Sequence, residues 1–399
     1  MTSFRLRRIR RFRFNLPQRI AAALLLLFLA QGLWLAARQP MTDRDFQFAL
    51  RGRQMWTGTG SATEPNTRFA VRDGILAYCL AGLPLTLDLW AQRGLDSLSK
   101  QPDGEAQSTV MDSPQEMRAF HWRMMRLLLL VRLPFLLAGL VLGAGLWWVA
   151  RRLYGNHGGY LALALYCFSP AMLRASTKPG SEILAALAIY GGVYTCIGVA
   201  HAMQGPRRKW RPRILLLMAL FAVAATSHWA ALALAALLGS ALMLWVAEGR
   251  RKLVFPIVLL ALGGAIVGAW ACYGFSLQSL SFFFTASAGF SCIAAMHVFA
   301  TPANAGVLVA AAAALVLYLV LRRARYFGNT APLLCVLVLL PLQLSGAPGA
   351  WVLPFLLTFV GGVFADAFEE PRGRWMQAAA GAIVLLQAVF CVLDLTGLL

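Results

Sequence analysis

Acidic residues stand directly behind the first long apolar segment of the chain. Asp43 and Asp45 belong to the stretch MTDRDFQFALRGRQMW at positions 41–56. A carboxylate at the edge of a membrane could act as a general base by accepting a proton from a hydroxyl group. Alternatively, both side chains could solvate the end of the apolar segment and cap a short surface helix, a role for which Asp45 is the better placed. The stretch is therefore a candidate catalytic site with a structural alternative.

A second candidate group lies in the short polar turn TKPGSE, between two apolar segments. Ionisable residues so close to the membrane are costly unless they are used. Lys178 could bind a phosphate group, and Glu182 could assist the base or hold a divalent cation. The alternative is a simple turn in which Glu182 begins a helix and complements the helix dipole.

Two further basic residues stand at boundaries of apolar segments. Arg132 opens the segment RLPFLLAGL and could either contact a phosphate or extend its charge to the lipid headgroups. His228 stands at the apex of an apolar block, in TSHW, where it could bind phosphate or anchor the chain at the interface. Both residues are substrate-binding candidates with structural alternatives.

The composition is that of a helical membrane protein. Of 399 residues, 59% are hydrophobic and 13% are charged, and apolar runs of about 20 residues match the ~30 Å hydrocarbon core of a bilayer. The net charge of +20 comes from short basic clusters between apolar runs, with no recognisable nucleic-acid module, so no nucleic-acid partner is expected. The seven cysteines show no CxxC or Cys/His ligand spacing, so neither a disulfide framework nor a metal site is indicated.

The basic clusters predict the topology, because Lys and Arg mark cytoplasmic loops. After the arginine-rich N-terminus, further basic clusters lie at 151–152, 205–213, 248–252, 322–325 and 369–374. Together with the apolar runs they predict about eleven spans, at 17–37, 133–150, 159–176, 182–203, 214–226, 229–247, 253–273, 303–321, 331–345, 351–366 and 375–397. The expected localisation is a multi-pass protein of a bacterial inner membrane with a cytoplasmic N-terminus.

These spans divide the chain. We expect a basic cytoplasmic N-terminus at 1–16, a first transmembrane helix at 17–37, an outer loop with interfacial helices at 38–132, transmembrane helices 2–7 at 133–273, an outer or re-entrant segment at 274–302, and helices 8–11 at 303–399.

Two segments refine this plan. The apolar stretch 75–90 is expected to lie at the interface rather than cross, since a crossing there would move most later basic clusters outside. The block 214–247 has basic flanks on both sides and is predicted to be a hairpin turning near His228. In the outer loop, Phe46, Ala49, Leu50 and Arg53 recur at helical spacing, which predicts an amphipathic surface helix.

The order of these features resembles that of membrane glycosyltransferases with the GT-C fold, the group of protein O-mannosyltransferases and aminoarabinose transferases. The resemblance lies in Arg132-Leu133-Pro134, in the turn ARRLYG at 150–155 and in Phe168-Ser169-Pro170. It is most specific over 132–200. It implies an all-α GT-C-like bundle and an inverting transferase. Such an enzyme moves a sugar from a polyprenyl-phosphate carrier to a lipid, glycan or protein on the outer face, in contact with membrane lipids.

The resemblance also implies where the site lies. The family's catalytic acid falls in the first outer loop, here at Asp43, and a second outer acid precedes the fourth span, here Glu182. Arg44 stands where the family commonly has a second adjacent acid, with Asp45 after it. A later family motif with histidine and a double proline corresponds to EPNTR at 64–68, which makes Arg68 a substrate-binding candidate.

These departures leave a second class of function open. The chain could be a non-catalytic GT-C-like scaffold or accessory subunit of a larger membrane complex. A transporter or lipid flippase is a third hypothesis, but no internal repeat is visible in the sequence. The sequence does not identify the sugar, the acceptor or a partner subunit.

Overall fold

The structure is a computed structural model that describes residues 15–57, 74–98, 114–206, 210–275, 301–341, 349–371 and 373–397. All the elements within these ranges are helical. They are α1 (Leu16–Arg38), α2 (Asp43–Thr57), α3 (Ile75–Leu98), α4 (Pro114–Cys167), α5 (Pro170–Thr177), α6 (Glu182–Met203), α7 (Arg211–Ser227), α8 (Trp229–Val246), η3 (Arg251–Leu253), α9 (Val254–Cys272), η4 (Pro302–Asn304), α12 (Ala305–Val320), η5 (Arg322–Ala324), α13 (Phe327–Leu339), α14 (Leu353–Phe368) and α15 (Gly373–Thr396).

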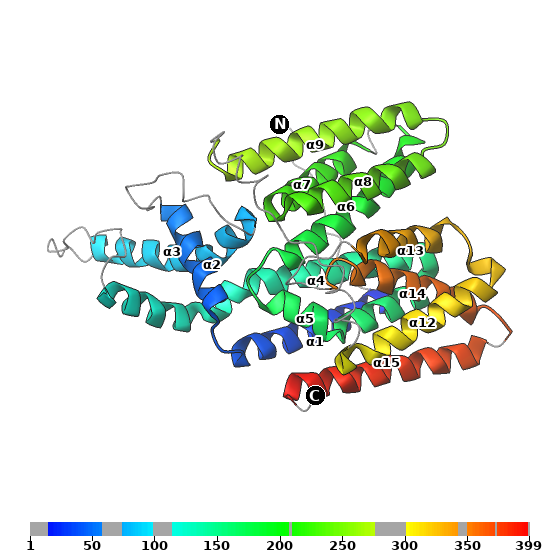
Figure 1. Ribbon diagram of the computed structural model, residues 1–399, viewed down its shortest axis with the longest axis horizontal. Coiled ribbons are helices and arrows are strands. Elements are labelled where there is room, and N and C mark those ends of the chain that lie inside the picture. Colours follow the sequence, from blue (N-terminus) through cyan, green and yellow to red (C-terminus); the bar gives the residue numbers. More distant parts are fainter. Residues whose placement is uncertain are drawn as a thin grey trace, which may run out of the picture.

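The helices form a bundle with α4 and α14 at its centre (Figure 1). Helices α6 to α9 pack together on one side of this pair, and α12, α13 and α15 cover the other side. Helix α14 is buried along nearly its whole length, whereas α9, α12 and α15 expose many large apolar side chains. Such exposure suits contact with lipid tails. The protein is therefore a multi-pass membrane protein, as the composition predicts.

Helices overlap each range that the sequence predicts to span the membrane. In the range 331–345, α13 ends at Leu339, and residues 342–348 lie outside the described residues. By length and composition, eight helical segments of the described residues could cross a membrane, and Ile75–Gln92 is one of them. The number of crossings, and the interfacial position expected for 75–90, stay predictions. The segments 1–14 and 276–300 lie outside the described residues, and so does Arg68.

Helix α4 contains two of the predicted spans, because the chain reverses at Gly155. This residue has φ 78° and ψ −169°, a conformation that essentially only glycine adopts. Beyond it the helix returns along its own first part, so that the Tyr166 hydroxyl donates to the carbonyl of Gly139 at 2.6 Å. The predicted turn at 150–155 is therefore present, as a sharp reversal at Gly155 between the two helical parts of α4.

The predicted third span is broken near its far end. Helix α4 ends at Cys167, and α5 begins at Pro170, which has no N–H to continue a helical ladder. Ser169 caps α5 by accepting from the backbone N–H of Met172 at 3.5 Å. The break lets α5 turn toward the end of the bundle where α6 begins.

The surface helix predicted from the amphipathic pattern is present as α2, but a different face is buried. Asp45, Phe48, Ala49 and Gly52 point inward, whereas Phe46 and Leu50 are only partly covered. The cause is α3, which packs against α2 so closely that Gly52 meets the backbone of Tyr78. A partner helix, rather than the membrane surface alone, sets the orientation of α2.

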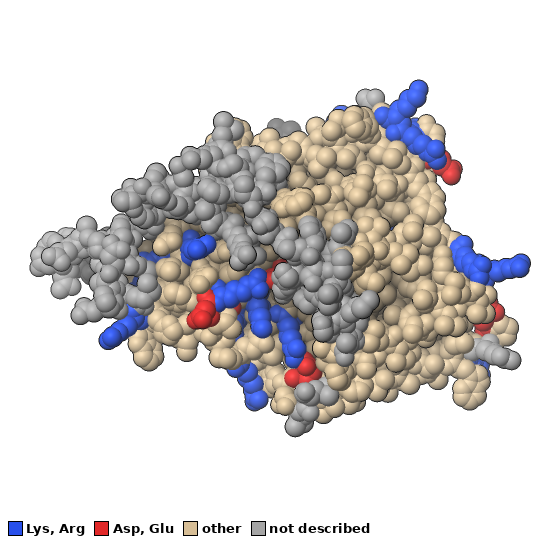
Figure 2. All heavy atoms as spheres, in the orientation of Figure 1, with Lys and Arg blue, Asp and Glu red and all other residues tan. Residues whose placement is uncertain are grey.

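Charged side chains separate into two groups on the face shown in Figure 2. One stands at the right edge, where the α8–α9 and α12–α13 connections lie in Figure 1, and the other lies near α2 and the adjacent end of α1. The described residues that are visible between them are uncharged. We call the end with the α8–α9, α12–α13 and α14–α15 connections the basic end.

Candidate functional site

The first turn of α2 holds both candidate aspartates, in different surroundings. Asp45 is buried and forms a reciprocal cap with Thr42, in which Thr42 N donates to Asp45 Oδ2 at 3.1 Å and Asp45 N donates to Thr42 Oγ1 at 3.2 Å. Asp43 is exposed to solvent. Alternate residues of a helix point in different directions, so the same short stretch supplies one structural acid and one accessible acid.

Asp45 is also one half of a buried ion pair with Arg132. Arg132 Nη2 lies 2.6 Å from Asp45 Oδ2, and the two side chains are 1% and 2% exposed. The guanidinium further donates to the carbonyls of Ala36, Gln39 and Pro40, at 2.7 to 2.9 Å. Arg132 thus joins the end of α1 and the start of α2 to α4. Both terminal nitrogens of Arg132, Nη1 and Nη2, therefore already donate hydrogen bonds to oxygen atoms of the protein.

Arg44, between the two aspartates, pairs with Glu182 at the start of α6. The distance from Arg44 Nη2 to Glu182 Oε1 is 2.7 Å, and the side chains are 41% and 14% exposed. The sequence pattern does not predict this contact, which joins residues 138 positions apart. The pair connects the first turn of α2, which also carries the exposed acid Asp43, to the start of α6.

That turn carries the other predicted residues of the site. Lys178 follows the last residue of α5 and is exposed, and Gly180 packs beneath the ion pair. A Cβ atom on Gly180 would overlap Glu182 Oε2 and would approach Arg44 Nη2 to 3.2 Å. A side chain at position 180 would therefore displace the Glu182 carboxylate.

His228 links α7 to α8, as the predicted hairpin requires. The residue is buried, and its Nδ1 accepts from the backbone N–H of Ala230 at 3.1 Å, so it caps α8. Its ring centroid lies 6.2 Å from that of Trp351. The Trp351 indole in turn donates to the backbone carbonyl of Glu182 at 3.2 Å. Trp351 was not a sequence candidate, although an aromatic residue two positions before the Leu-Pro of a span could have suggested one.

The structure therefore brings the start of α2, the α5–α6 turn, the α7–α8 turn and Trp351 together at one end of the bundle. We call this end the site end. Arg132 lies behind α2 in the same region, and Arg68 lies outside the described residues. Among the sequence candidates at the site end and their neighbour Arg44, the exposed charged residues are Asp43, Arg44 and Lys178.

A metal site is not formed by these residues as they stand. Within the described ranges, no group of three or more His, Cys, Asp and Glu side chains could hold a metal ion. Glu182 Oε1 is paired with the Arg44 guanidinium. The divalent cation that Glu182 was expected to hold stays a prediction.

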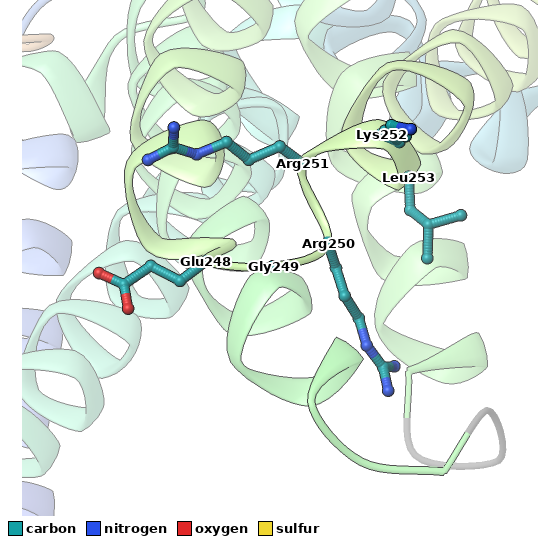
Figure 3. A pocket seen from close by; sticks show the side chains of 6 residues that line it. All are labelled: Glu248, Gly249, Arg250, Arg251, Lys252 and Leu253. Atoms are coloured by element: carbon teal, nitrogen blue, oxygen red, sulfur yellow. The ribbon is translucent and has the colours of Figure 1, made fainter.

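An open pocket lies elsewhere, at the α8–α9 turn of the basic end, lined by Glu248, Gly249, Arg250, Arg251, Lys252 and Leu253 (Figure 3). Helix α8 separates it from His228 by about 27 Å, at 1.5 Å per residue. In Figure 3 the side chains of Arg250 and Arg251 point away from each other, and Arg250 donates to the carbonyl of Met203. The cations do not converge on one ligand position, so this pocket is not the candidate site.

Comparisons with known proteins identify the fold. No protein-family model and no curated protein sequence matches the chain. ArnT from Cupriavidus metallidurans in the apo state matches 91% of this chain, with a TM-score of 0.56 and 14% sequence identity. The oligosaccharyltransferase of Archaeoglobus fulgidus, in complex with zinc and sulfate, matches 93% of it, with a TM-score of 0.54 and 12% identity.

The chain spans 61% and 52% of the lengths of these two proteins. Both are glycosyltransferases with the GT-C fold, so the fold expected from the sequence resemblance is confirmed. Activity has to be argued from the site, because one fold can host different functions.

Proposed function

We propose that this protein transfers a sugar from a polyprenyl-phosphate carrier to a lipid, glycan or protein acceptor at the outer face of a bacterial inner membrane. The observation that carries the proposal is the exposed Asp43 carboxylate at the site end of a GT-C bundle. It lies in the first turn of α2, next in sequence to Arg44, whose pair with Glu182 reaches the turn that carries Lys178. The N-terminus and the basic end would then face the cytoplasm, in keeping with the distribution of Lys and Arg.

The residues can be assigned to steps of an inverting transfer. Asp43 takes the proton from the acceptor hydroxyl, and the acceptor oxygen attacks the anomeric carbon of the sugar. The bond between that carbon and the phosphate oxygen breaks, and the phosphate leaves with the bonding electrons. Lys178 stabilises the negative charge on the leaving phosphate.

The other candidates support this arrangement. Asp45 and Arg132 hold the first turn of α2 in place through their buried pair, and so position Asp43. Glu182 is a second acid of the site, at present paired with Arg44. His228 and Trp351 form an aromatic wall next to Glu182. A substrate-binding role for Arg68 remains a sequence prediction.

The test is a transfer assay with the full chain in proteoliposomes and radiolabelled polyprenyl-phosphate sugars as donors. Asp43→Asn should lower the rate of transfer by about 10²-fold or more, because a general base contributes typically 10²- to 10⁴-fold. Glu248→Gln is the matched control, since it removes one exposed acid at the basic end. Full activity of Asp43→Asn would sink the assignment of the base.

A non-catalytic role is the second candidate, and one observation favours it. Of the three acids predicted for the site, Asp45 and Glu182 are each paired with an arginine, which leaves Asp43 to supply the base. An accessory subunit would keep the scaffold and bind other membrane proteins. Stable co-purification with such subunits in mild detergent, together with no transfer from any polyprenyl-phosphate sugar, would favour this reading over the enzyme.

A further inference from the structure

The Arg44 side chain makes an aromatic contact and an ionic contact at the surface of the site end. Its guanidinium carbon lies 5.4 Å from the centre of the Phe48 ring, and Phe48 stacks on Tyr78 at 4.2 Å. Its Nη2 atom lies 2.7 Å from Glu182 Oε1. The aromatic contact lies against the guanidinium itself, whereas the ionic contact printed for Nη2 is with Oε1 of a partly exposed carboxylate.

We propose that Arg44 is the phosphate-recognition residue of this site and that a carrier phosphate competes with Glu182 for its guanidinium. The inference rests on the proposed function for the identity of the phosphate, which is that of the lipid carrier. Binding of the donor then frees the Glu182 carboxylate to face the acceptor. An arginine in the first turn of α2 would in this way couple donor binding to the exposure of a second acid.

The chemistry of the guanidinium supports such an exchange. Arginine presents a planar fork of N–H donors that matches phosphate oxygens as well as carboxylate oxygens. An ion pair that is 41% and 14% exposed is weakly stabilising, so a second anion can replace one partner at little cost. Lys178 is exposed on the same turn as Glu182 and adds positive charge where the phosphate would arrive.

The competition predicts opposite effects for the two partners of the ion pair. Arg44→Ala should weaken the binding of polyprenyl phosphate by about 10-fold or more, because a hydrogen bond between charged groups is worth roughly 1.5–3 kcal/mol. Glu182→Gln should tighten the same binding by about threefold or more, because the competing charge is gone while Arg44 stays. A contact that only tethers α2 to α6 would make both substitutions weaken binding.

Gly180→Ala provides a test that changes no charge. Its Cβ atom would displace the Glu182 carboxylate from the guanidinium, so it should also tighten binding of polyprenyl phosphate. Arg51→Ala is the control for loss of one positive charge, since Arg51 is an exposed arginine of the same helix, and it should change the dissociation constant by less than about twofold.

Dissociation constants would be measured on the full chain in detergent with three probes: polyprenyl phosphate, the corresponding polyprenol and inorganic phosphate. If the substitutions change the binding of inorganic phosphate in the same pattern, the phosphate group alone is the ligand. If they leave the binding of inorganic phosphate unchanged, the ligand is the phosphate of the lipid. Either outcome supports the inference. Unchanged binding in Arg44→Ala, weaker binding in Glu182→Gln, or the same pattern with polyprenol would overturn it.

Parallel transfer assays separate this inference from the proposed function. A protein that shows the binding pattern but transfers no sugar would contradict the proposed function and leave phosphate recognition by Arg44 standing. Transfer of sugar without the binding pattern would contradict the role of Arg44 alone.

Discussion

At the scale of single residues, the site end shows how neighbours in sequence acquire different roles. Asp45 is a cap and the partner of a buried arginine, whereas Asp43 meets solvent two residues earlier. Arg44 reaches across to another helix. The direction in which each side chain leaves the first turn of α2 decides which of them can meet a substrate.

This difference predicts opposite consequences for two equivalent substitutions. Asp45→Asn keeps a side chain that can cap α2 but leaves Arg132 with an uncompensated buried charge, which should lower the free energy of unfolding by roughly 3 kcal/mol. Asp43→Asn should change it by less than about 0.5 kcal/mol, as for most surface substitutions. Denaturation of the purified variants in detergent would measure both. Equal stabilities would show that the buried pair is not important for folding.

At the scale of helices, the places where the ladder of backbone hydrogen bonds is interrupted determine the architecture. The reversal at Gly155 makes two antiparallel parts out of α4. The break before Pro170 exposes the carbonyl of Phe168, which accepts from Gln387 of α15 at 2.9 Å. Each interruption is stabilised by a specific residue, and each can be tested separately.

Gly155→Ala should destabilise the protein by about 1–3 kcal/mol, because alanine does not tolerate the backbone conformation at this position. Gly145→Ala is the matched control. Gly145 lies inside the helical first part of α4 and has open space where a Cβ atom would be, so alanine should be neutral or slightly stabilising there. Thermal unfolding of both variants would measure the difference. A Gly155→Ala variant as stable as Gly145→Ala would contradict the reversal at this residue.

Gln387 joins three helical ends in the bundle. Its Nε2 donates to the carbonyls of Phe168 and Ala303 at 2.9 Å each, and its Oε1 accepts from the N–H of Val307 at 3.0 Å. Gln387→Leu would leave these buried backbone groups without partners and should cost at least about 2 kcal/mol. Gln377→Leu, at an exposed position of the same helix, should be nearly neutral. Comparable unfolding temperatures for the two variants would refute the role of Gln387.

At the scale of the whole molecule, the two ends of the bundle differ in chemistry. At the basic end, α6 contacts the α8–α9 turn through Arg250, and Trp245 of α8 packs on Phe327 of α13 with ring centroids 5.1 Å apart. At the site end, α2, α6 and the residues before α14 meet around Glu182. Basic loops are retained in the cytoplasm, so the basic end should lie there.

Thiol labelling of a chain without its native cysteines would test this orientation. Lys178→Cys, at the site end, should react with a membrane-impermeant maleimide in intact cells, because the residue is exposed and predicted to lie outside. Glu248→Cys, at the basic end, should react only after the membrane is permeabilised. The reverse pattern would place the candidate site in the cytoplasm and would contradict the proposed donor chemistry.

Local pattern was enough to predict the helical membrane fold, the hairpin at His228 and the surface helix α2. Apolar runs, basic clusters and helical periodicity act between near neighbours in sequence, and such signals survive without knowledge of the tertiary contacts. The turn at 150–155 and the Phe-Ser-Pro segment also marked their helix boundaries correctly, and the resemblance they carried led to the GT-C fold.

Tertiary structure alone decided which acids are paired and which face of α2 is buried. Asp45 meets Arg132 across 87 positions, and Arg44 meets Glu182 across 138. No periodicity in one segment encodes such partners, because they depend on how separate helices pack. The packing of α2 against α3 and α4 buries Asp45 on Arg132 and leaves Asp43 exposed, and this exposure is the reason for proposing Asp43 as the base.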